Sequence, residues 1–335
     1  MTVYNRTFNE QDWQATNIIN RGILDDFIME YRANEKKEST LKQYYNDGRI
    51  ILIYILKKCN NRSILELKKK DFRNFTLWLI EEQGVSSSRS NRLMSCCRSI
   101  LNFCEDDDDY DYDQNFAAKQ KGRPNVPVRD ICFLTNDEIM KIIDYLIENE
   151  EYQKATLVSL FYDSAGRKNE IAQVTKESFL DPKNNCTNMV IGKRGKKFKL
   201  VYFSKTKECA KLWLEQRGED SIDSLWCLRN AKNHDVKKES SGDNIYNWII
   251  GLRDLHVELG GTPMDFNPHS IRHSSLEAFS TNTHYVCKEL GMTEGFPLEE
   301  LKLIAHHNSI ETTQSYLKDK SSEKLSEMFG GIVFD

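Results

Sequence analysis

Histidines concentrate in one late stretch of the chain, residues 268–316. Five of the seven histidines fall there together with an arginine and a tyrosine: His269, Arg272, His273, His284, His306, His307 and Tyr316. Neutral imidazole is a common metal ligand, but no cysteine pair at zinc spacing lies nearby. An arginine binds phosphate or carboxylate and does not ligate metals. The mixture indicates a site that binds phosphate and moves protons around it.

Two upstream segments add further charged side chains. Arg167 stands at a helix start preceded by glycine, with Glu170 one turn later. Two strand-like runs then predict a β-hairpin. Its tip carries three lysines: Lys193, Lys196 and Lys197. Taken alone, such an arginine is commonly a surface ion pair of small energetic value, and such a hairpin is either a solvated loop or a phosphate contact.

Together these side chains could cleave a phosphodiester without a metal. A tyrosine oxygen can attack phosphorus and form a covalent ester, which keeps the bond energy for a later rejoining. Arginines would neutralise the non-bridging oxygens in the transition state. A lysine could protonate the leaving oxygen, and a histidine could accept or relay the tyrosine proton.

Length and composition favour a helical protein with two domains. The chain has 335 residues, 39% hydrophobic and 29% charged, with only 16 glycines and 6 prolines. Nine cysteines are scattered without a disulfide framework, which is typical of a reducing cytosol. We expect neither secretion nor membrane insertion, because no signal-like start and no run of eighteen apolar residues occurs. The net charge of −4 does not by itself indicate a nucleic-acid binder, although basic residues gather locally.

Helical periodicity divides the chain into segments. We expect an arm or a first short helix over residues 1–16, a helical domain over 17–113, a linker over 114–133, a second domain over 134–325 and a tail over 326–335. The first domain offers seven basic residues for DNA binding: Lys42, Lys68, Lys69, Lys70, Arg89, Arg92 and Arg98. The acidic run 105–113 is interpreted as a solvated stretch leading into the linker. Alternatively, it occupies a basic groove until nucleic acid displaces it.

The second domain is predicted to be helical around one hairpin. Its predicted strands lie near 189–192 and 198–203, joined by a turn over 193–197. Its predicted helices are residues 139–147, 154–162, 206–216, 244–259, 274–279 reading on past 285, 298–305 and 310–316. The fold class is therefore mainly α with a small β-hairpin.

The order Arg167, Lys193, His269-Ser-Ile-Arg272, His307, Tyr316 resembles the tyrosine recombinase (phage integrase) family. That family has the signature Arg, Lys, His-x-x-Arg, His or Trp, then Tyr. Three segments are similar to its first arginine box, its hairpin lysine and its nucleophile box: Ser164-Ala-Gly-Arg-Lys-Asn-Glu-Ile, Val190-Ile-Gly-Lys-Arg-Gly-Lys-Lys and His307-Asn-Ser-Ile-Glu-Thr-Thr-Gln-Ser-Tyr316. The resemblance covers about residues 17–325. It implies a SAM-like helical core-binding domain followed by a mixed α/β catalytic domain.

The resemblance implies a role for each matched residue. The residues matched to the family's catalytic set are Arg167, Lys193, His269, Arg272, His307 and Tyr316, with Glu170, Lys196 and Lys197 as supporting residues. In the family, the two arginines hold the scissile phosphate, the lysine is the general acid on the 5′ oxygen, and the first histidine handles a proton. The second histidine hydrogen-bonds the phosphate, and the tyrosine becomes a 3′-phosphotyrosine. Lys196 and Lys197 are rivals of Lys193 for the acid.

Two departures from the family pattern stand out. His306 occupies a position where the family usually has glycine, which would crowd the backbone before the last helix. The net acidity and the run 105–113 are also unusual. The apolar tail either packs on its own domain or, as the family suggests, docks on a neighbouring protomer.

By resemblance we expect a site-specific recombinase that acts on duplex DNA with an inverted-repeat core site. It would be a monomer in solution and a homo-tetramer on DNA, with an accessory DNA-bending or directionality factor as a further partner. No cofactor, metal or membrane is implied, and the expected location is the cytoplasm of a bacterial or phage-infected cell, at the nucleoid. The rival hypothesis is a recombinase-fold transcriptional regulator that no longer recombines. A topoisomerase-like or telomere-resolving relative is a third.

Overall fold

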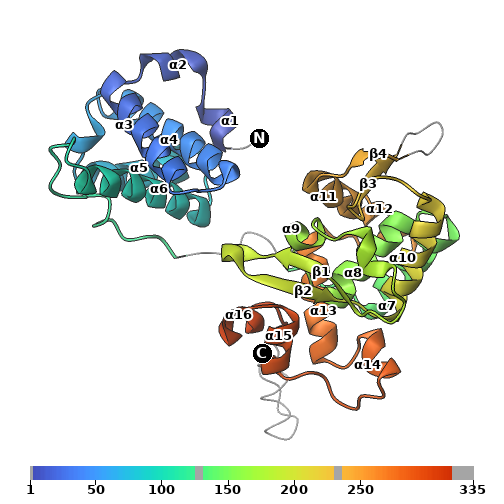
Figure 1. Cartoon of the computed structure of the whole chain (residues 1–335). Coiled ribbons are helices and arrows are strands. Elements are labelled where there is room, and N and C mark those ends of the chain that lie inside the picture. Colours follow the sequence, from blue (N-terminus) through green and yellow to red (C-terminus); the bar gives the residue numbers. More distant parts are fainter. Residues whose placement is uncertain (1–2, 125–130, 230–235, 319–335) are drawn as a thin grey trace, which may run out of the picture. The chain divides into compact units, whose positions relative to one another are not determined.

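The computed structural model describes residues 3–124, 131–229 and 236–318, which form two compact units, Met1–Asp130 and Ile131–Asp335 (Figure 1). Each unit has its own hydrophobic core of buried side chains. Both are mainly helical, and the predicted fold class is confirmed. Within the described ranges, no helix has the length and apolar character needed to cross a membrane. The predicted tail over residues 326–335 lies outside the described residues.

Unit 1 is wholly helical. Its elements are α1 (Val3–Thr7), α2 (Glu10–Ala15), α3 (Ile18–Ala33), α4 (Glu38–Lys58), η1 (Ile64–Glu66), α5 (Lys69–Leu77), η2 (Trp78–Glu82) and α6 (Ser87–Asp106). Helix α4 is apolar on most sides over Ile50–Ile55 and contacts both α3 and α6, so it forms the centre of the unit. Helix α6 begins at the cap residue Ser86, whose hydroxyl accepts the Arg89 backbone N–H.

Of the two alternatives for residues 1–16, an arm or a short helix, the structure shows the helical one. The segment forms α1 and α2, and Trp13 lies buried in the core of unit 1 at 6% exposure. The Arg49 guanidinium packs 4.9 Å from the Trp13 ring centroid and donates a hydrogen bond to the Tyr4 hydroxyl. One aromatic anchor therefore holds a segment that is too short to show periodicity.

The acidic stretch 105–113 also differs from the interpretation as a solvated linker. Helix α6 runs to Asp106, after which Tyr110 donates to the Asp26 carboxylate and Tyr112 is buried. Ala117, inside the predicted linker, is also fully buried in this core. The aromatic rings hold the backbone on unit 1 while the acidic side chains between them face solvent. Residues 125–130, the remainder of that segment before unit 2, lie outside the described residues.

The seven predicted DNA-binding residues separate into two groups. Lys42, Lys68, Lys69, Lys70 and Arg92 are exposed. Arg89 makes a two-pronged contact with the buried Asp47 carboxylate, and Arg98 donates to the carbonyl oxygens of Ala117 and Gln120. These two arginines therefore hold unit 1 together. The first group faces solvent, although Arg92 also lies 3.5 Å from the Asp47 carboxylate and the Lys68 amine lies 4.5 Å from the Phe116 ring centroid.

Arg89→Ala is expected to destabilise unit 1 by about 2–4 kcal/mol, because it leaves the buried Asp47 carboxylate without its main partner. Thermal or urea unfolding of the full chain measures this loss. Arg92→Ala is the matched control, because Arg92 is 46% exposed and lies 3.5 Å from the same carboxylate. We expect it to cost less than about 1 kcal/mol. Equal losses in the two variants would contradict a structural role peculiar to Arg89.

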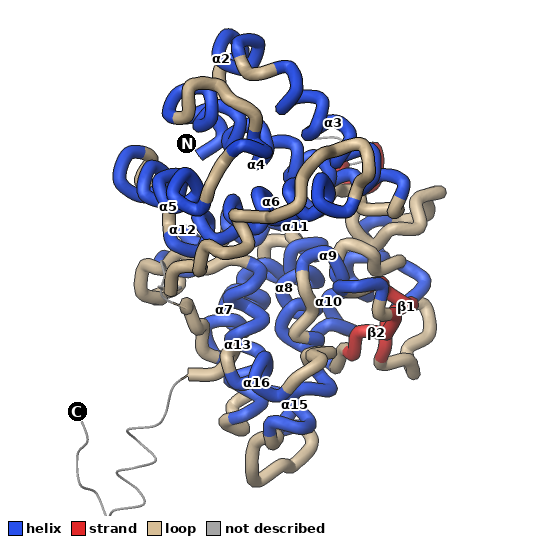
Figure 2. The backbone as a smooth tube through the Cα atoms, turned by 90° about the vertical axis from the view of Figure 1, so that its left-hand side faces the viewer, coloured by secondary structure: helices blue, strands red, loops and turns tan. Residues whose placement is uncertain are grey.

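Unit 2 combines helices with two small antiparallel sheets of two strands each. Its helices are α7 (Asn136–Glu148), α8 (Tyr152–Ser164), α9 (Lys168–Ile171), η3 (Lys176–Phe179), η4 (Lys193–Gly195), α10 (Ser204–Arg217), α11 (Gly242–Ile250), α12 (Arg253–Glu258), α13 (Pro268–Ser280), α14 (Tyr285–Glu289), α15 (Leu298–Ile304) and α16 (Ile310–Gln314). Its strands are β1 (Cys186–Ile191), β2 (Lys197–Val201), β3 (Cys227–Arg229) and β4 (Val236–Glu239). Helix α8 is buried all round between α7, α10 and α13 (Figure 2).

The predicted hairpin is confirmed as β1 paired antiparallel to β2, with Val190 opposite Phe198. The pair β3–β4 was not predicted. The predicted helix 244–259 is divided into α11 and α12 at Gly251 and Leu252, and the predicted helix at 274 begins earlier, at Pro268. Proline suits that first turn because its missing N–H would have no helical partner.

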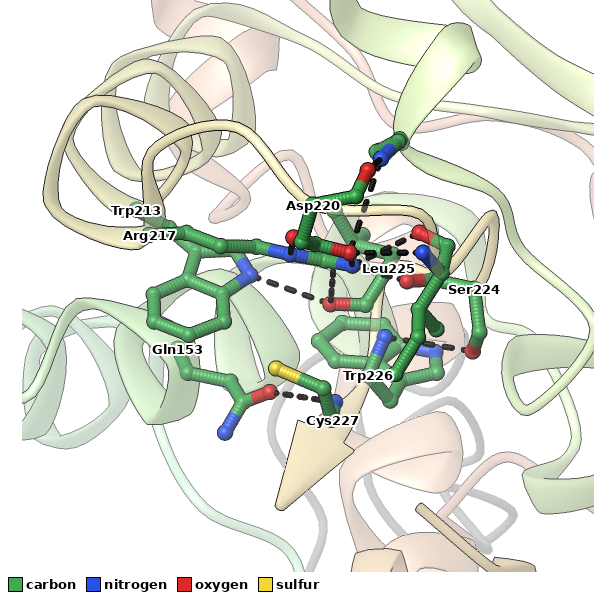
Figure 3. A network of polar contacts seen from close by, with 10 residues as sticks. Gln153, Trp213, Arg217, Asp220, Ser224, Leu225, Trp226 and Cys227 are labelled. Atoms are coloured by element: carbon green, nitrogen blue, oxygen red, sulfur yellow. Dashed lines mark hydrogen bonds and ion pairs between the residues drawn. The ribbon is translucent and has the colours of Figure 1, made fainter. Parts of the chain in front are cut away.

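A polar network joins the end of α10 to the segment that leads into β3 (Figure 3). Arg217 contacts Asp220 through two nitrogens and also donates to the Ser224 carbonyl (2.7 Å). This fixes the strand leading into β3, where the Trp226 Nε1 donates to the Ile171 carbonyl at 2.6 Å. Because Ile171 ends α9, the network holds the short helix that begins at Arg167.

Candidate active site

Arg167 is the N-cap residue of α9 and is fixed by Glu170. The Glu170 carboxylate accepts two hydrogen bonds from Arg167, one from the backbone N–H at 2.8 Å and one from the side-chain Nη1 at 3.0 Å. Glu170 is 1% exposed, whereas the Arg167 side chain remains 30% exposed. The carboxylate therefore orients the guanidinium and leaves its other N–H groups available to an anion.

Arg272 joins three separate segments of unit 2. It is fully buried on α13 and donates to the carbonyl oxygens of Ala165 and, at 2.7 Å, Ala305. Its Nη2 also lies 2.7 Å from the His307 Nε2. Its Nε is buried and has no hydrogen-bond partner among the described residues. This one guanidinium thus ties the loop before Arg167 to the turn that carries His307.

The partners of His307 determine its tautomer. Arginine has only donors, so the His307 Nε2 must accept from Arg272. The proton then lies on Nδ1, which donates to the Thr313 hydroxyl at 3.1 Å. Burial, reinforced by the positive charges of Arg272 and Arg167, lowers the pKa of His307 to about 3. The imidazole is therefore neutral at pH 7, in agreement with the hydrogen bonds.

Tyr316, two residues beyond α16, lies among three imidazole rings and a guanidinium. Its ring centroid is 4.3 Å from that of His273, 4.8 Å from that of His307 and 5.1 Å from that of His269. The Arg272 guanidinium carbon lies 5.1 Å from the same centroid. His273 also donates through Nδ1 to the Tyr316 carbonyl at 3.0 Å. Both the ring and the backbone of Tyr316 are thereby held in place.

His269 offers a proton acceptor beside Tyr316. Partial burial, together with the charges on His273, Arg272 and Arg167, lowers the pKa of His269 to about 4, although part of the residue stays exposed. A neutral imidazole can accept a proton, which a charged one cannot. The imidazole ring meets the Tyr316 ring in an edge contact.

The two arginines act on each other. Burial, with the charge of Arg167 acting in the same direction, lowers the pKa of Arg272 to about 10. Arg272 stays protonated at pH 7, so its positive charge and that of Arg167 repel each other, while the Glu170 carboxylate attracts both. An anion between the guanidinium groups would relieve this repulsion, which is the electrostatic signature of a phosphate site.

The hairpin lysines lie at an exposed tip. Lys193, Lys196 and Lys197 are all exposed, and the turn includes Arg194 and Gly195 at φ values of 62° and 76°. The Gly192 N–H donates to the Lys196 carbonyl at 2.7 Å and closes the turn. All three amines can therefore reach a ligand outside the protein surface.

The structure brings most of the predicted residues together. Arg167, Arg272, His269, His307 and Tyr316 form one cluster, and Glu170 supports it. His273 was interpreted only as a support for its neighbours, yet its ring stacks on Tyr316. Its spacing of four from His269 was the available signal, because residues four apart share a helix face. No group of three or more metal-ligating side chains occurs within the described ranges.

Acidification is expected to destabilise unit 2 between about pH 6.5 and pH 3. Burial lowers the pKa of both His284 and His307 to about 3. In the unfolded chain these imidazoles take up protons near pH 6.5, whereas in the folded protein they resist protonation, so the stability present above pH 6.5 is lost as pH falls. We expect a total loss of a few kcal/mol by about pH 4, measured as the thermal midpoint against pH.

His284→Phe serves as the control for this acid effect. The His284 ring stacks on Phe279 and Tyr162, so phenylalanine keeps the ring packing but cannot titrate. The variant lacks the N-cap hydrogen bond in which the His284 Nδ1 accepts from the Val286 N–H. Its free energy of unfolding at pH 7 should therefore be slightly lower. Its midpoint should then depend less steeply on pH. An unchanged slope would mean that other groups cause the acid loss.

Comparison with known proteins places the chain in a family. The family model described as "Phage integrase family" matches residues 132–323, which is more than half of the chain. The chain therefore belongs to the phage integrase family. The SPbeta prophage-derived recombinase-like protein YomM of Bacillus subtilis (strain 168) is 24% identical over 94% of this chain and 92% of its own length. The tyrosine recombinase of Thermosipho africanus (strain TCF52B) is 24% identical over 90% and 96%.

Solved structures share the fold. XerH site-specific recombinase bound to a palindromic difH substrate matches with a TM-score of 0.64 and 15% identity, covering 89% of this chain and 82% of that chain. A lambda integrase tetramer bound to a Holliday junction also matches with a TM-score of 0.64, at 13% identity, covering 90% of this chain and 77% of that chain. At these identities, the likeness supports the two-unit helical architecture alone.

Proposed function

We propose that Tyr316 is the nucleophile with which this site-specific recombinase cleaves and rejoins duplex DNA. The observation that carries the proposal is the single cluster in which Arg272, His269 and His307 surround the Tyr316 ring, with Arg167 acting on the same groups. Such a site holds an anion and a proton acceptor beside a phenol. These are the parts that a metal-independent phosphoryl transfer needs.

Cleavage exchanges the bond from phosphorus to the 5′ oxygen for a bond from phosphorus to tyrosine. The Tyr316 oxygen attacks phosphorus while its proton passes to the neutral His269 imidazole. The bond from phosphorus to the 5′ oxygen breaks, and a hairpin lysine, Lys193 or its rivals Lys196 and Lys197, protonates that oxygen. Arg167 and Arg272 stabilise the charge on the non-bridging oxygens. Attack of a 5′ hydroxyl on the phosphotyrosine reverses the step and rejoins a strand.

The domain roles follow from the same proposal. Unit 2 is the catalytic domain, and unit 1 is a core-binding domain that contacts DNA phosphates through Lys42, Lys69 and Lys70, which are exposed. Binding should fall steeply with salt, because each neutralised phosphate releases counterions. The lambda integrase neighbour is a tetramer on a Holliday junction. By analogy, we propose that this protein acts as a homo-tetramer on an inverted-repeat site.

The deciding experiment is a covalent trap. The binding site is first located by footprinting the full-length protein on DNA flanking its gene, and a suicide duplex with a nick beside the scissile phosphate is made from that sequence. The protein should form an adduct that survives denaturation, and peptide mapping should locate the nucleotide on Tyr316. Specific binding without an adduct would favour the transcriptional regulator instead, and an adduct on another residue would refute the assignment of Tyr316.

A further inference from the structure

His306 occupies a conformation that is unfavourable for its residue type. Its φ of 51° lies in the left-handed region, which is sterically disfavoured for a residue with a Cβ atom. The position follows the end of α15, and the His306 N–H donates to the Leu303 carbonyl at 3.1 Å. Glycine is the usual residue at such a helix end. A histidine retained there calls for a compensating contact.

The His306 side chain makes that contact with the lysine-bearing hairpin. Its ring stacks on Phe198 of β2, with centroids 3.9 Å apart and planes 24° from parallel. Space for the Phe198 ring exists because residue 192 is glycine: a Cβ there would come within 2.6 Å of the Phe198 ring and 3.2 Å of the Glu170 carboxylate. Phe198 follows Lys197 in the sequence at the start of β2. The stack therefore joins the base of the hairpin turn to His306, which directly precedes His307.

The charge state of His306 fits packing better than phosphate binding. Burial lowers its pKa to about 4; the charge of Glu170 opposes this shift, and those of Lys196, Arg272 and Arg167 assist it. The imidazole is therefore neutral at pH 7 and can stack on an apolar ring without burying a charge. Its Nε2 is buried and has no partner among the described residues.

We propose that His306 is a positioning residue that fixes the hairpin lysine over the site by packing its ring on Phe198. The hairpin otherwise ends in an exposed turn, and an amine on such a turn would sample many positions. Joining the hairpin base to the turn before His307 couples the lysine to the Tyr316 cluster. The inference rests on the proposed cleavage reaction, in which that lysine protonates the leaving 5′ oxygen.

The test replaces the leaving oxygen by sulfur. Two suicide duplexes are made from the footprinted site, one with an ordinary phosphate and one with a 5′-bridging phosphorothiolate. A thiolate leaves without protonation, so a defect in the general acid disappears on the sulfur substrate. His306→Gly and His306→Asn both remove the ring while suiting the left-handed backbone. We expect each variant to form adduct about tenfold or more slowly on phosphate and within about threefold of the unmodified protein on sulfur.

Further variants separate positioning from folding. Phe198→Leu removes the stack from the other side and should show the same selective loss, and the double variant should lose no more than either single one. Lys193→Ala and Lys196→Ala each remove a candidate general acid, and their rates of adduct formation on the two substrates show how the loss of that acid appears in this assay. Phe179→Leu is the matched control, because Phe179 is a partly buried ring packed at 4.6 Å on Tyr202, just past the far end of β2. It should cleave both substrates normally.

The outcomes separate the two proposals. Equal loss on both substrates, or normal cleavage of both, in the His306 variants and in Phe198→Leu would overturn the positioning role. If His306→Gly fails to fold, Phe198→Leu and His306→Asn decide the matter by the same criterion. No adduct from the unmodified protein on either substrate would refute the cleavage reaction itself.

Discussion

Replacing Tyr316 by phenylalanine is expected to abolish the covalent adduct, a loss of at least about 10⁴-fold in single-turnover cleavage. Phenylalanine has no oxygen with which to form the phosphate ester. The ring stack on His273 and the hydrogen bond from His273 to the residue 316 carbonyl do not use the hydroxyl, so they should remain. DNA binding and the thermal midpoint should therefore stay close to those of the unmodified protein.

Tyr285→Phe is the matched control for this loss. Tyr285 lies in the same unit, and its hydroxyl donates to the buried Asp163 carboxylate at 2.7 Å. Removing that hydroxyl should cost about 1–2 kcal/mol of stability but leave adduct formation intact. The two variants thus distinguish a tyrosine hydroxyl that acts as a nucleophile from one that only stabilises the fold. An adduct that persists in Tyr316→Phe would assign the nucleophile to a different residue.

The candidate site was predictable because its residues keep a fixed order along the chain. The boxes around Arg167, Arg272 and Tyr316 each have a local pattern of helix starts and spacing, and local patterns survive in a sequence. The hairpin was predictable for the same reason, since alternation is visible over a few residues. The three-dimensional arrangement of these segments could not be predicted from the sequence. Contacts such as that of His273 with Tyr316 depend on packing between residues that are 43 positions apart in the sequence.

The structures of residues 1–16 and 105–113 were hard to predict for one physical reason. Charge and short length dominated the interpretation of residues 1–16 and 105–113, while single aromatic side chains decided their structure. Trp13 and Tyr112 each bury a large ring in the core of unit 1, which offsets the cost of ordering a polar segment. The structure around His306 could not be predicted either. The replacement of glycine by histidine indicates a crowded backbone, but it does not reveal that the imidazole ring stacks on Phe198.

Arg272→Lys is expected to slow cleavage by about 10²–10³-fold even in protein that is fully folded and bound to DNA. Lysine keeps the positive charge but cannot present the planar set of donors that a guanidinium offers to phosphate oxygens. It also cannot reach the Ala165 and Ala305 carbonyls together with His307. A stability loss of about 1–3 kcal/mol should accompany the change, because buried acceptors lose their donor.

Arg217→Lys separates these two effects. Arg217 is likewise a buried arginine on unit 2, and its partners are Asp220 and the carbonyls of Ile222, Ser224 and Leu225. The substitution should lower the unfolding midpoint by a comparable amount, yet cleavage measured well below both midpoints should stay within about threefold of normal. If Arg272→Lys also cleaved normally under those conditions, its guanidinium would serve folding alone. A selective loss in Arg272→Lys, with binding retained, would mean that the buried guanidinium joining three segments also stabilises the transferring phosphate.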